Sequence, residues 1–228
     1  MDITLIQVLG GYATVLARYR RVLEQRNRLL HDVASGTQSP TTIDQWDEQL
    51  AELGQKIWED RTLIAAELNL AACSAHLELF DSAQERLELR YQRSDRSLAE
   101  LLQLNRGRDI ALRHTSVGPH RDDLMVFVNG RPAARFASQG QQRCAAVAIR
   151  LGERILMERR LGMSPVMLLD DVMSELDPIR RTSLTKMVAG KGQVWITGAA
   201  EDVFPSNCLE MGGRRWKVVQ GSIVDDQS

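Results

Sequence analysis

The sequence has few of the features that mark secreted, zinc-binding or membrane-spanning proteins. Its three cysteines, at positions 73, 144 and 208, are widely scattered and odd in number. They fit neither a disulfide framework nor a zinc pattern, so they favour a reducing compartment. No apolar stretch approaches the roughly 20 residues needed to span a bilayer, and the N-terminus lacks a basic-then-apolar signal region. We therefore expect a cytoplasmic protein that does not enter a membrane.

The sequence also lacks an excess of charge of either sign. The formal net charge is −1, with 26% charged and 43% hydrophobic residues. Such a balance gives no overall attraction to nucleic acid, so any DNA contact must come from a local patch. The first helical segment offers arginines that could contact DNA phosphate, although a solvated helix face is favoured. These arginines are Arg18, Arg20, Arg21, Arg26 and Arg28.

Apolar residues recur at helical spacing through the first half of the chain. Residues 12–33 carry a heptad seam that ends at Gly36 and Pro40. A second stripe runs from Trp46 to Leu68, and a third, in a shifted frame, passes through Leu77, Leu87 and Leu101. The frame shift at residues 70–75 indicates either a bend or a stutter within one helix. We predict an α-helical arm of two or more antiparallel segments over residues 1–113.

The period changes in the second half, which we predict to be an α/β unit over residues 114–228. A strand before Asn129-Gly130 predicts a type I′ hairpin. Residues 140–161 read as a helix, and residues 166–169 read as a strand buried on both faces. A helix beginning near Asp177 and an apolar strand at residues 194–197 complete a βαβ unit with parallel pairing. A final hairpin covers residues 216–224.

The strand at residues 166–169 ends in two adjacent carboxylates, Asp170 and Asp171, followed by Ser-Glu-Leu-Asp. Ligands collect at the carboxyl ends of parallel strands, and two carboxylates there suit Mg²⁺ and a water beside a nucleotide phosphate. The competing interpretation is a pair of helix-capping or solvated loop carboxylates. No G-x-x-x-x-G-K-[ST] loop to cradle phosphates occurs anywhere in the sequence.

The helix of residues 140–161 begins with Ala-Ser-Gln-Gly-Gln-Gln-Arg at positions 137–143. Ser138 and Gly140 at a helix start leave backbone N–H groups and the positive end of the helix dipole facing outward, which suits an anion. Taken alone, a plain N-cap by Ser138 is the commoner explanation. The acidic strand end that follows in the sequence favours the phosphate site.

These motifs together resemble the signature, Walker B and D-loop segments of ABC-type ATPase heads. The resemblance is closer to the RecF family, which is related to the SMC proteins. Further similarity lies in Thr-Ser-Val-Gly-Pro-His-Arg-Asp-Asp-Leu at positions 115–124 and in the arm segment at residues 20–30. The resemblance implies the C-terminal half of an ABC/SMC-like head, with a βαβ parallel sheet and hairpins, preceded by an antiparallel helical arm.

The resemblance also implies roles for individual residues. Asp170 would hold Mg²⁺ through its waters, and Asp171 would polarise the attacking water where most such heads use glutamate. Thr197 occupies the place of the usual switch histidine, so it is only a candidate phosphate sensor. The remaining residues would act across a dimer: Ser138, Gln139, Gly140 and Gln141 on the ATP of the opposite subunit, and Ser174 and Asp177 as the D-loop contact.

From the same resemblance we expect an ATP- and Mg²⁺-dependent protein of recombinational repair and replication. It would form an ATP-sandwich homodimer, hydrolyse ATP slowly, bind DNA at single-strand gaps, and act with RecO and RecR in loading RecA. Because the phosphate loop is absent, we expect this chain to be the C-terminal part of such a protein, from a truncated or split gene or an internal start, and to be inactive alone.

Two other classes of function stay open at this point. One is an interaction module without ATPase activity, made of the arm and half of a head. The other is a metal-dependent hydrolase that uses the Asp170–Asp171 pair with the segment His120-Arg-Asp-Asp. A structural turn is the favoured interpretation of that segment.

Overall fold

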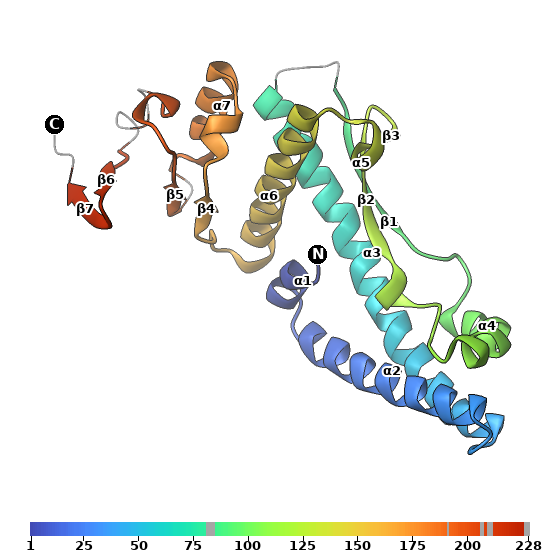
Figure 1. Ribbon diagram of the computed structural model, residues 1–228. Coiled ribbons are helices and arrows are strands. Elements are labelled where there is room, and N and C mark those ends of the chain that lie inside the picture. Colours follow the sequence, from blue (N-terminus) through green and yellow to red (C-terminus); the bar gives the residue numbers. More distant parts are fainter. Residues whose placement is uncertain (81–84, 191, 206–207, 209–211, 226–228) are drawn as a thin grey trace.

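The computed structural model describes residues 1–80, 85–190, 192–205, 208 and 212–225. The helices and strands follow one another in the order shown in Figure 1: α1 Asp2–Val8, α2 Tyr12–Ala34, α3 Asp44–Phe80, β1 Leu87–Gln92, α4 Leu98–Leu112, β2 Asp123–Val128, β3 Arg131–Pro132, α5 Ala133–Phe136, α6 Gln139–Leu161, β4 Met167–Leu169, α7 Pro178–Val188, β5 Val194–Ile196, β6 Trp216–Val219 and β7 Ser222–Asp225. Short 3₁₀ turns lie at η1 Pro40–Ile43, η2 Pro119–Arg121, η3 Val172–Glu175 and η4 Glu201–Val203.

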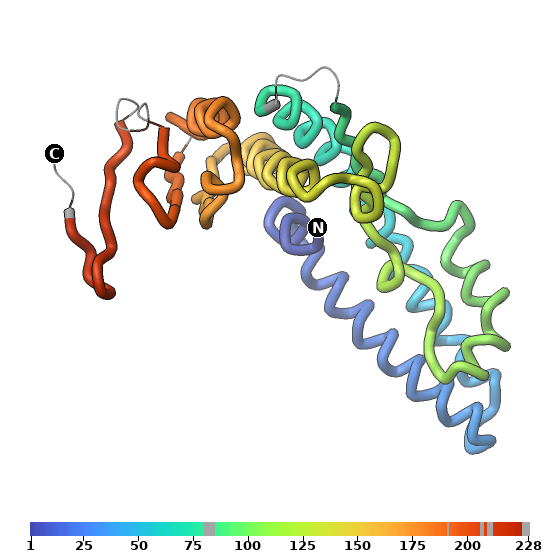
Figure 2. Tube along the Cα trace, turned by 45° about the horizontal axis from the view of Figure 1, so that its top comes forward, coloured from blue at the N-terminus to red at the C-terminus, as the bar shows by residue number. Residues whose placement is uncertain are grey.

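The α-helical hairpin predicted from the heptad seam is present. Helix α2 runs away from the centre of the molecule, and α3 returns antiparallel beside it (Figure 2). Tyr12, Leu16, Tyr19 and Leu30 of α2 are buried in the seam. Helix α3 is continuous over 37 residues, so the frame shift at residues 70–75 is a stutter within one helix.

The prediction that the helical stripe continues through Leu87 is wrong. Residues 87–92 form strand β1, which pairs antiparallel with β2 from Leu87↔Val128 to Gln92↔Asp123. Burial along β1 alternates, with Leu87 and Leu89 in the core, because successive side chains of a strand point to opposite faces. This pair joins residues on either side of the predicted domain boundary at position 113. The boundary itself stays a prediction.

The βαβ unit and both hairpins follow the sequence pattern. Strands β4 and β5 pair in parallel, and β6 and β7 pair antiparallel. Asn129 and Gly130 join β2 to β3 with φ values of 52° and 73°. Positive φ at both central residues is what a type I′ turn requires, and glycine adopts it without steric cost.

The expectation that strand β4 is buried on both faces is wrong. Met167 and Leu169 lie in the core, whereas Leu168 points to the opposite face and is 73% exposed. Its register partner Trp195 stacks on Trp216 of β6, with ring centroids 5.4 Å apart, and is still 46% exposed. The physical reason is that the described helices pack against one face of this two-stranded sheet, which leaves the other face open.

Helix α6 lies between two hydrophobic clusters and carries the start of the candidate site. Its Ala145, Ala148 and Leu156 pack into the cluster formed by the arm, β1 and β2, while Val147 and Leu151 pack into the cluster with β4 and α7. Helix α3 contributes to both clusters. The two clusters therefore fix α6 between the arm and the parallel strands.

Candidate functional site

Parallel pairing places the ends of β4 and β5 at one edge of the sheet. The register runs from Met167↔Val194 to Leu169↔Ile196, so Asp170 and Thr197 leave the sheet side by side. The Thr197 N–H donates to the Leu169 carbonyl at 3.0 Å and extends the pairing by one step. Two of the predicted site residues thus meet at the carboxyl edge, where open α/β sheets bind ligands.

The Thr197 hydroxyl joins both candidate carboxylate residues. Its Oγ1 donates to Asp170 Oδ1 at 2.5 Å and accepts from the Asp171 backbone N–H at 3.1 Å. Both aspartates are exposed to solvent. Asp171 has φ 52° and ψ 18°, a left-handed conformation that is uncommon outside glycine but tolerated by aspartate. This conformation turns the chain sharply from the strand into η3.

The segment expected to be the D-loop is the turn η3 with the residues up to Asp177. The Ser174 hydroxyl donates to Asp171 Oδ1 at 2.5 Å, which ties the turn to the second carboxylate. Asp177 caps α7: its Oδ1 accepts from the Arg180 N–H at 3.0 Å, and its Oδ2 lies 3.1 Å from Arg180 Nε. Asp177 therefore performs a capping role in this chain, alongside the dimer contact predicted for it.

The candidate signature residues form the N-terminus of α6. Ser138 is the N-cap of a capping box: its Oγ accepts from the Gln141 N–H at 3.2 Å, and its own N–H donates to Gln141 Oε1 at 3.0 Å. Because Ser138 Oγ accepts in that bond, its hydroxyl proton remains able to serve as a donor. The N–H groups of Gln139 and Gly140 belong to the unpaired first turn of the helix.

The surroundings of this helix start leave room for a ligand. Ser138, Gln139 and Gly140 are exposed, and Gln141 is partly buried. A Cβ built at Gly140 would meet no atom nearer than Ser138 Oγ at 3.9 Å, so the packing of this chain does not require glycine there. Outward N–H groups at the positive end of a 23-residue helix suit an anion.

The helix start and the carboxylates are joined only indirectly. Among the described residues, no hydrogen bond links residues 138–141 to Asp170 or Asp171. Instead Arg143 Nε of α6 lies 3.3 Å from Glu175 Oε1 in η3, and Arg180 Nη1 lies 3.6 Å from Cys144 Sγ. The structure therefore brings Asp170, Asp171, Ser174 and Thr197 together and leaves the signature residues as a second group.

Glu85 is a site neighbour that the sequence did not reveal. Its Oε2 accepts from Gln141 Nε2 at 3.0 Å, and its Oε1 lies 3.2 Å from His76 Nε2. A carboxylate accepts hydrogen bonds, so it holds the Gln141 amide with its NH₂ toward Glu85 and its oxygen toward Ser138. Nothing in the local sequence signals this role, since Glu85 is a single acid outside every motif.

The donor set at the strand end fits Mg²⁺. Carboxylate and hydroxyl oxygens are hard ligands, and Mg²⁺ is commonly held by one or two carboxylates together with waters and substrate phosphates. Asp170 and Asp171 are both exposed, and Thr197 engages one oxygen of Asp170. The described residues contain no group of three or more His, Cys, Asp or Glu side chains that could hold a metal on their own.

The segment containing His120 serves the packing of the arm. His120 Nδ1 lies 2.7 Å from the Tyr19 hydroxyl, and its Nε2 lies 3.2 Å from the Thr115 carbonyl. Asp122 Oδ2 accepts from Trp58 Nε1 and, at 2.7 Å, from the Tyr91 hydroxyl. The bonded polar atoms favour the structural turn over the hydrolase alternative.

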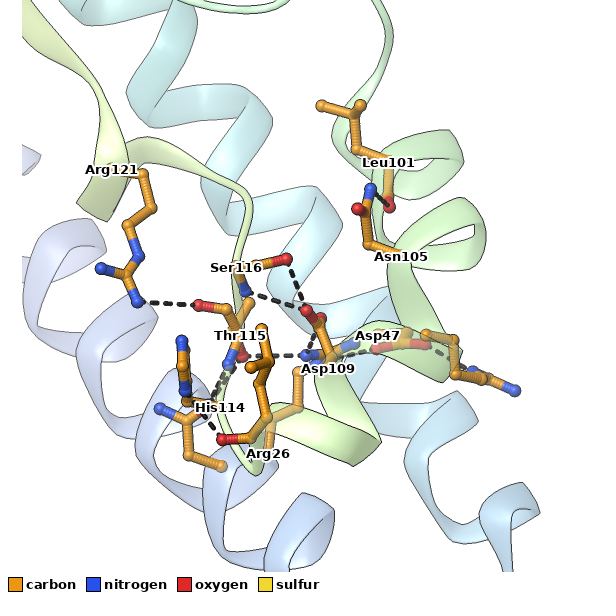
Figure 3. A network of polar contacts seen from close by, with 12 residues as sticks. Arg26, Asp47, Leu101, Asn105, Asp109, His114, Thr115, Ser116 and Arg121 are labelled. Carbon is orange, nitrogen blue, oxygen red and sulfur yellow. Dashed lines mark hydrogen bonds and ion pairs between the residues drawn. The ribbon is translucent and has the colours of Figure 1, made fainter. Parts of the chain in front are cut away.

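The sequence predicts that Arg26 lies on a DNA-facing or solvated helix surface, and this prediction is wrong. Its side chain has no exposed surface. It donates to Asp47 Oδ1 at 2.6 Å, Asp109 Oδ2 at 2.9 Å and Thr115 Oγ1 at 2.8 Å, in the network of Figure 3. The reason is that α4 and the segment after it close over this position of the seam.

The chain is similar to known proteins over most of its length. No family model matches the chain. RecF, described as a DNA replication and repair protein, is 36% identical over 225 residues in Lachnoclostridium phytofermentans and 38% identical over 221 residues in Halothermothrix orenii. These alignments cover 98% and 91% of this chain but only 62% and 58% of the relatives, so the chain spans about three fifths of their length.

A solved structure agrees with these relatives. The structure of the recombination mediator protein RecF with ATP, from the RecFOR pathway, superposes with a TM-score of 0.83 at 28% identity. It covers 98% of this chain and 61% of that one. None of the helices in the described part of this chain is both long enough and apolar enough to cross a membrane. Sequence and fold therefore agree that this chain is RecF-like and aligns with about three fifths of these RecF proteins.

Proposed function

We propose that this chain is the part of a RecF-like, ATP-dependent DNA-binding protein that carries the signature, Walker B and D-loop segments. The observation that supports this most directly is the strand end, where Thr197 holds Asp170 and the Asp171 backbone. Two exposed carboxylates with a neighbouring hydroxyl suit a magnesium–nucleotide site. The protein would act in recombinational repair at single-strand gaps, with RecO and RecR, in loading RecA.

In this proposal each group of side chains has one task. Asp170 would hold Mg²⁺ through its waters; the ion would neutralise charge on the phosphates. Asp171 would orient and polarise the attacking water, and Ser174 would fix its carboxylate. Aspartate is shorter than glutamate by one methylene, so slow hydrolysis is expected.

The start of α6 would act across a homodimer. Ser138 Oγ–H and the N–H groups of Gln139 and Gly140 would donate to the γ-phosphate of ATP held by the opposite subunit, with Gln141 keeping the first turn in place. Ser174 and Asp177 would form the D-loop contact between subunits. ATP hydrolysis would then determine when the two subunits separate.

The test uses a chimera that joins this chain to the remaining part of the RecF protein of Lachnoclostridium phytofermentans. Asp171→Asn should abolish ATP turnover and prolong the ATP-bound dimer, whereas Ser138→Arg should block ATP-dependent dimerisation while ATP still binds. Dimerisation is followed by analytical ultracentrifugation and turnover by phosphate release. Normal hydrolysis by Asp171→Asn would remove it from the water-polarising role.

Ser97→Arg is the matched control for Ser138→Arg. Ser97 also caps a helix through a capping box, with Glu100, but it lies on α4 in the arm. Both changes remove an N-cap at a cost of about 1 kcal/mol, so only a specific effect at the trans site separates them. Equal loss of dimerisation in both variants would contradict the proposed role of Ser138.

An interaction module without ATPase activity is the second candidate. The open face of β4 and β5, with Leu168 73% exposed and Trp195 46% exposed, favours it because apolar surface of this kind commonly marks a binding face. It predicts that the chimera neither hydrolyses ATP nor dimerises with ATP.

A further inference from the structure

The D-loop turn is anchored by two buried side chains. Met173 has no exposed surface and Leu176 is 4% exposed, and both pack in the cluster between α6 and α7. The turn is closed by a hydrogen bond from the Leu176 N–H to the Met173 carbonyl at 3.2 Å. Side-chain packing places the turn, but the Leu176 carbonyl at its end still needs a donor.

Arg181, on the first turns of α7, supplies that donor. Its Nε lies 2.8 Å from the Met173 carbonyl oxygen and 2.8 Å from the Leu176 carbonyl oxygen, so one N–H is shared between them. Its Nη1 lies 3.4 Å from the carbonyl oxygen of Asp202, in η4 after β5. One guanidinium thus joins the D-loop turn to the segment that follows Thr197.

The position of this turn gives Arg181 its importance. Asp171 begins the turn and Asp177 ends it, and Ser174 within it donates to Asp171 at 2.5 Å. A change in the turn therefore reaches the candidate water-polarising carboxylate at its start, whereas Asp177 at its end is held separately by capping α7. Hydrogen bonds from a charged donor to backbone carbonyls are stronger than neutral ones, which suits a fixed support.

We propose that Arg181 is a positioning residue that holds the D-loop turn against the segment after β5, and so keeps Asp171 and Asp177 in fixed relation. This rests on the proposed function for its effect on ATP turnover. Arg181 has no direct contact with ATP in the proposal; it acts through the backbone of the turn. Its role is thereby to transmit a contact made at the D-loop to Asp171.

The structural half of the proposal is tested on the 228-residue chain itself by amide hydrogen exchange. In Arg181→Met the Leu176 amide should exchange about tenfold faster, because the support of its acceptor Met173 is lost. Arg181→Lys keeps the positive charge but lacks the planar guanidinium. Its Leu176 amide should exchange at a rate between those of Arg181→Met and the unchanged chain. Lys186→Met, which removes an exposed cation from the other end of α7, is the matched control and should leave the exchange unchanged.

The functional half is tested in the chimera by measuring turnover and dimerisation separately. Arg181→Met should lower turnover by about tenfold to a hundredfold through misplacement of Asp171, while ATP-dependent dimerisation through Ser138 is kept. A purely structural role would lower both together, or neither. Unchanged exchange at Leu176, or a parallel loss of turnover and dimerisation, would overturn the proposal. If the unsubstituted chimera shows no ATP-dependent behaviour, the proposed function fails, and the exchange result still decides whether Arg181 holds the turn.

Discussion

Arg26 Nη1 and Asp109 Oδ2 lie 2.9 Å apart, and neither side chain has any exposed surface. The pair joins α2 to α4, which are 83 residues apart in the sequence at these positions. Asp109 also accepts from the N–H of Ser116 at 3.0 Å, and Thr115 accepts from Arg26. The network thus secures the segment between α4 and β2 against the helical hairpin.

Arg26→Met should lower the free energy of unfolding by about 3–5 kcal/mol, because it removes the cation that is paired with the buried Asp109 carboxylate. Arg28→Met is the control on the same helix: its side chain is 66% exposed and its ion pair with Glu24 is long, at 3.9 Å. We expect a change of about 0.5 kcal/mol or less there. Urea denaturation measures both, and equal effects would show that the buried pair does not stabilise the arm.

The close approach of α6 to α3 should make Gly152 intolerant of substitution. A Cβ at Gly152 would lie 2.7 Å from the backbone N of Ala72 and 2.8 Å from its Cα, so the helices must move apart. Gly152→Ala should therefore destabilise the protein by about 1–3 kcal/mol. Gly107→Ala, on α4 with nothing within 4 Å of the added Cβ, should stabilise it by about 0.5–1 kcal/mol through helix propensity and chain entropy. Thermal unfolding that moves both variants in the same direction would contradict this account.

Thr197 should act on the carboxylates through its hydroxyl. In the chimera, Thr197→Val removes the donor to Asp170 and the acceptor for the Asp171 N–H while preserving shape, and Thr197→Ser preserves both bonds. We expect Thr197→Val to raise the Mg²⁺ concentration for half-maximal turnover by about tenfold, as for other residues that orient metal ligands. Thr197→Ser should need nearly the same Mg²⁺ concentration for half-maximal turnover as the unsubstituted chimera. Identical Mg²⁺ titrations for the two variants would show that the hydroxyl does not orient the site.

The arm should lose stability as the pH falls below neutrality. Desolvation of the ring lowers the pKa of His120 below its ordinary value of 6.5 although the residue is partly open to solvent, and burial lowers the pKa of His76, which is 1% exposed. A neutral His120 donates from Nε2 to the Thr115 carbonyl and accepts from the Tyr19 hydroxyl at Nδ1. Because the folded pKa is depressed, this contribution is complete above pH 6.5 and is lost as the pH falls through the folded value.

Denaturation midpoints at several pH values between about 5 and 8 measure this loss. His120→Gln should flatten the dependence, with the part due to His76 remaining. His114→Gln, just after α4, where Nδ1 faces the nearby Leu112 carbonyl, should leave the pH dependence unchanged. An unchanged dependence in His120→Gln would exclude this histidine as the source.

Elements that are governed by one local pattern have the structure that the sequence predicts. The N-cap at Ser138, the strand before Asp170 and the Asn129-Gly130 turn each depend on neighbours a few residues away. Strand β1 carried a local signal too, since Leu87, Leu89 and Tyr91 alternate, but the helical stripe on either side concealed it. In residues 87–92 the alternation typical of a strand, and not the helical spacing of the neighbouring segments, matches the structure.

The rest could not be read from the sequence because it depends on partners far along the chain. Arg26 occupies a heptad position like any other, and its burial follows from Asp109 and Thr115, which lie 83 and 89 residues away. Glu85 meets Gln141 across 56 residues. The exposure of Leu168 depends on which elements cover the sheet. No periodicity encodes these contacts.

The length of α3 gives the molecule a mechanical property. Near its beginning the helix holds the α2 hairpin through Asp47 and Arg26, and near its end Ala72 lies against Gly152 of α6. Its 37 residues make a stiff rod of about 55 Å. Tilting such a rod by about 5° displaces its far end by about 5 Å, by the geometry of a helix rising 1.5 Å per residue. A slight tilt of α6, if transmitted to α3, would thus displace the hairpin tip far enough to make or break a contact.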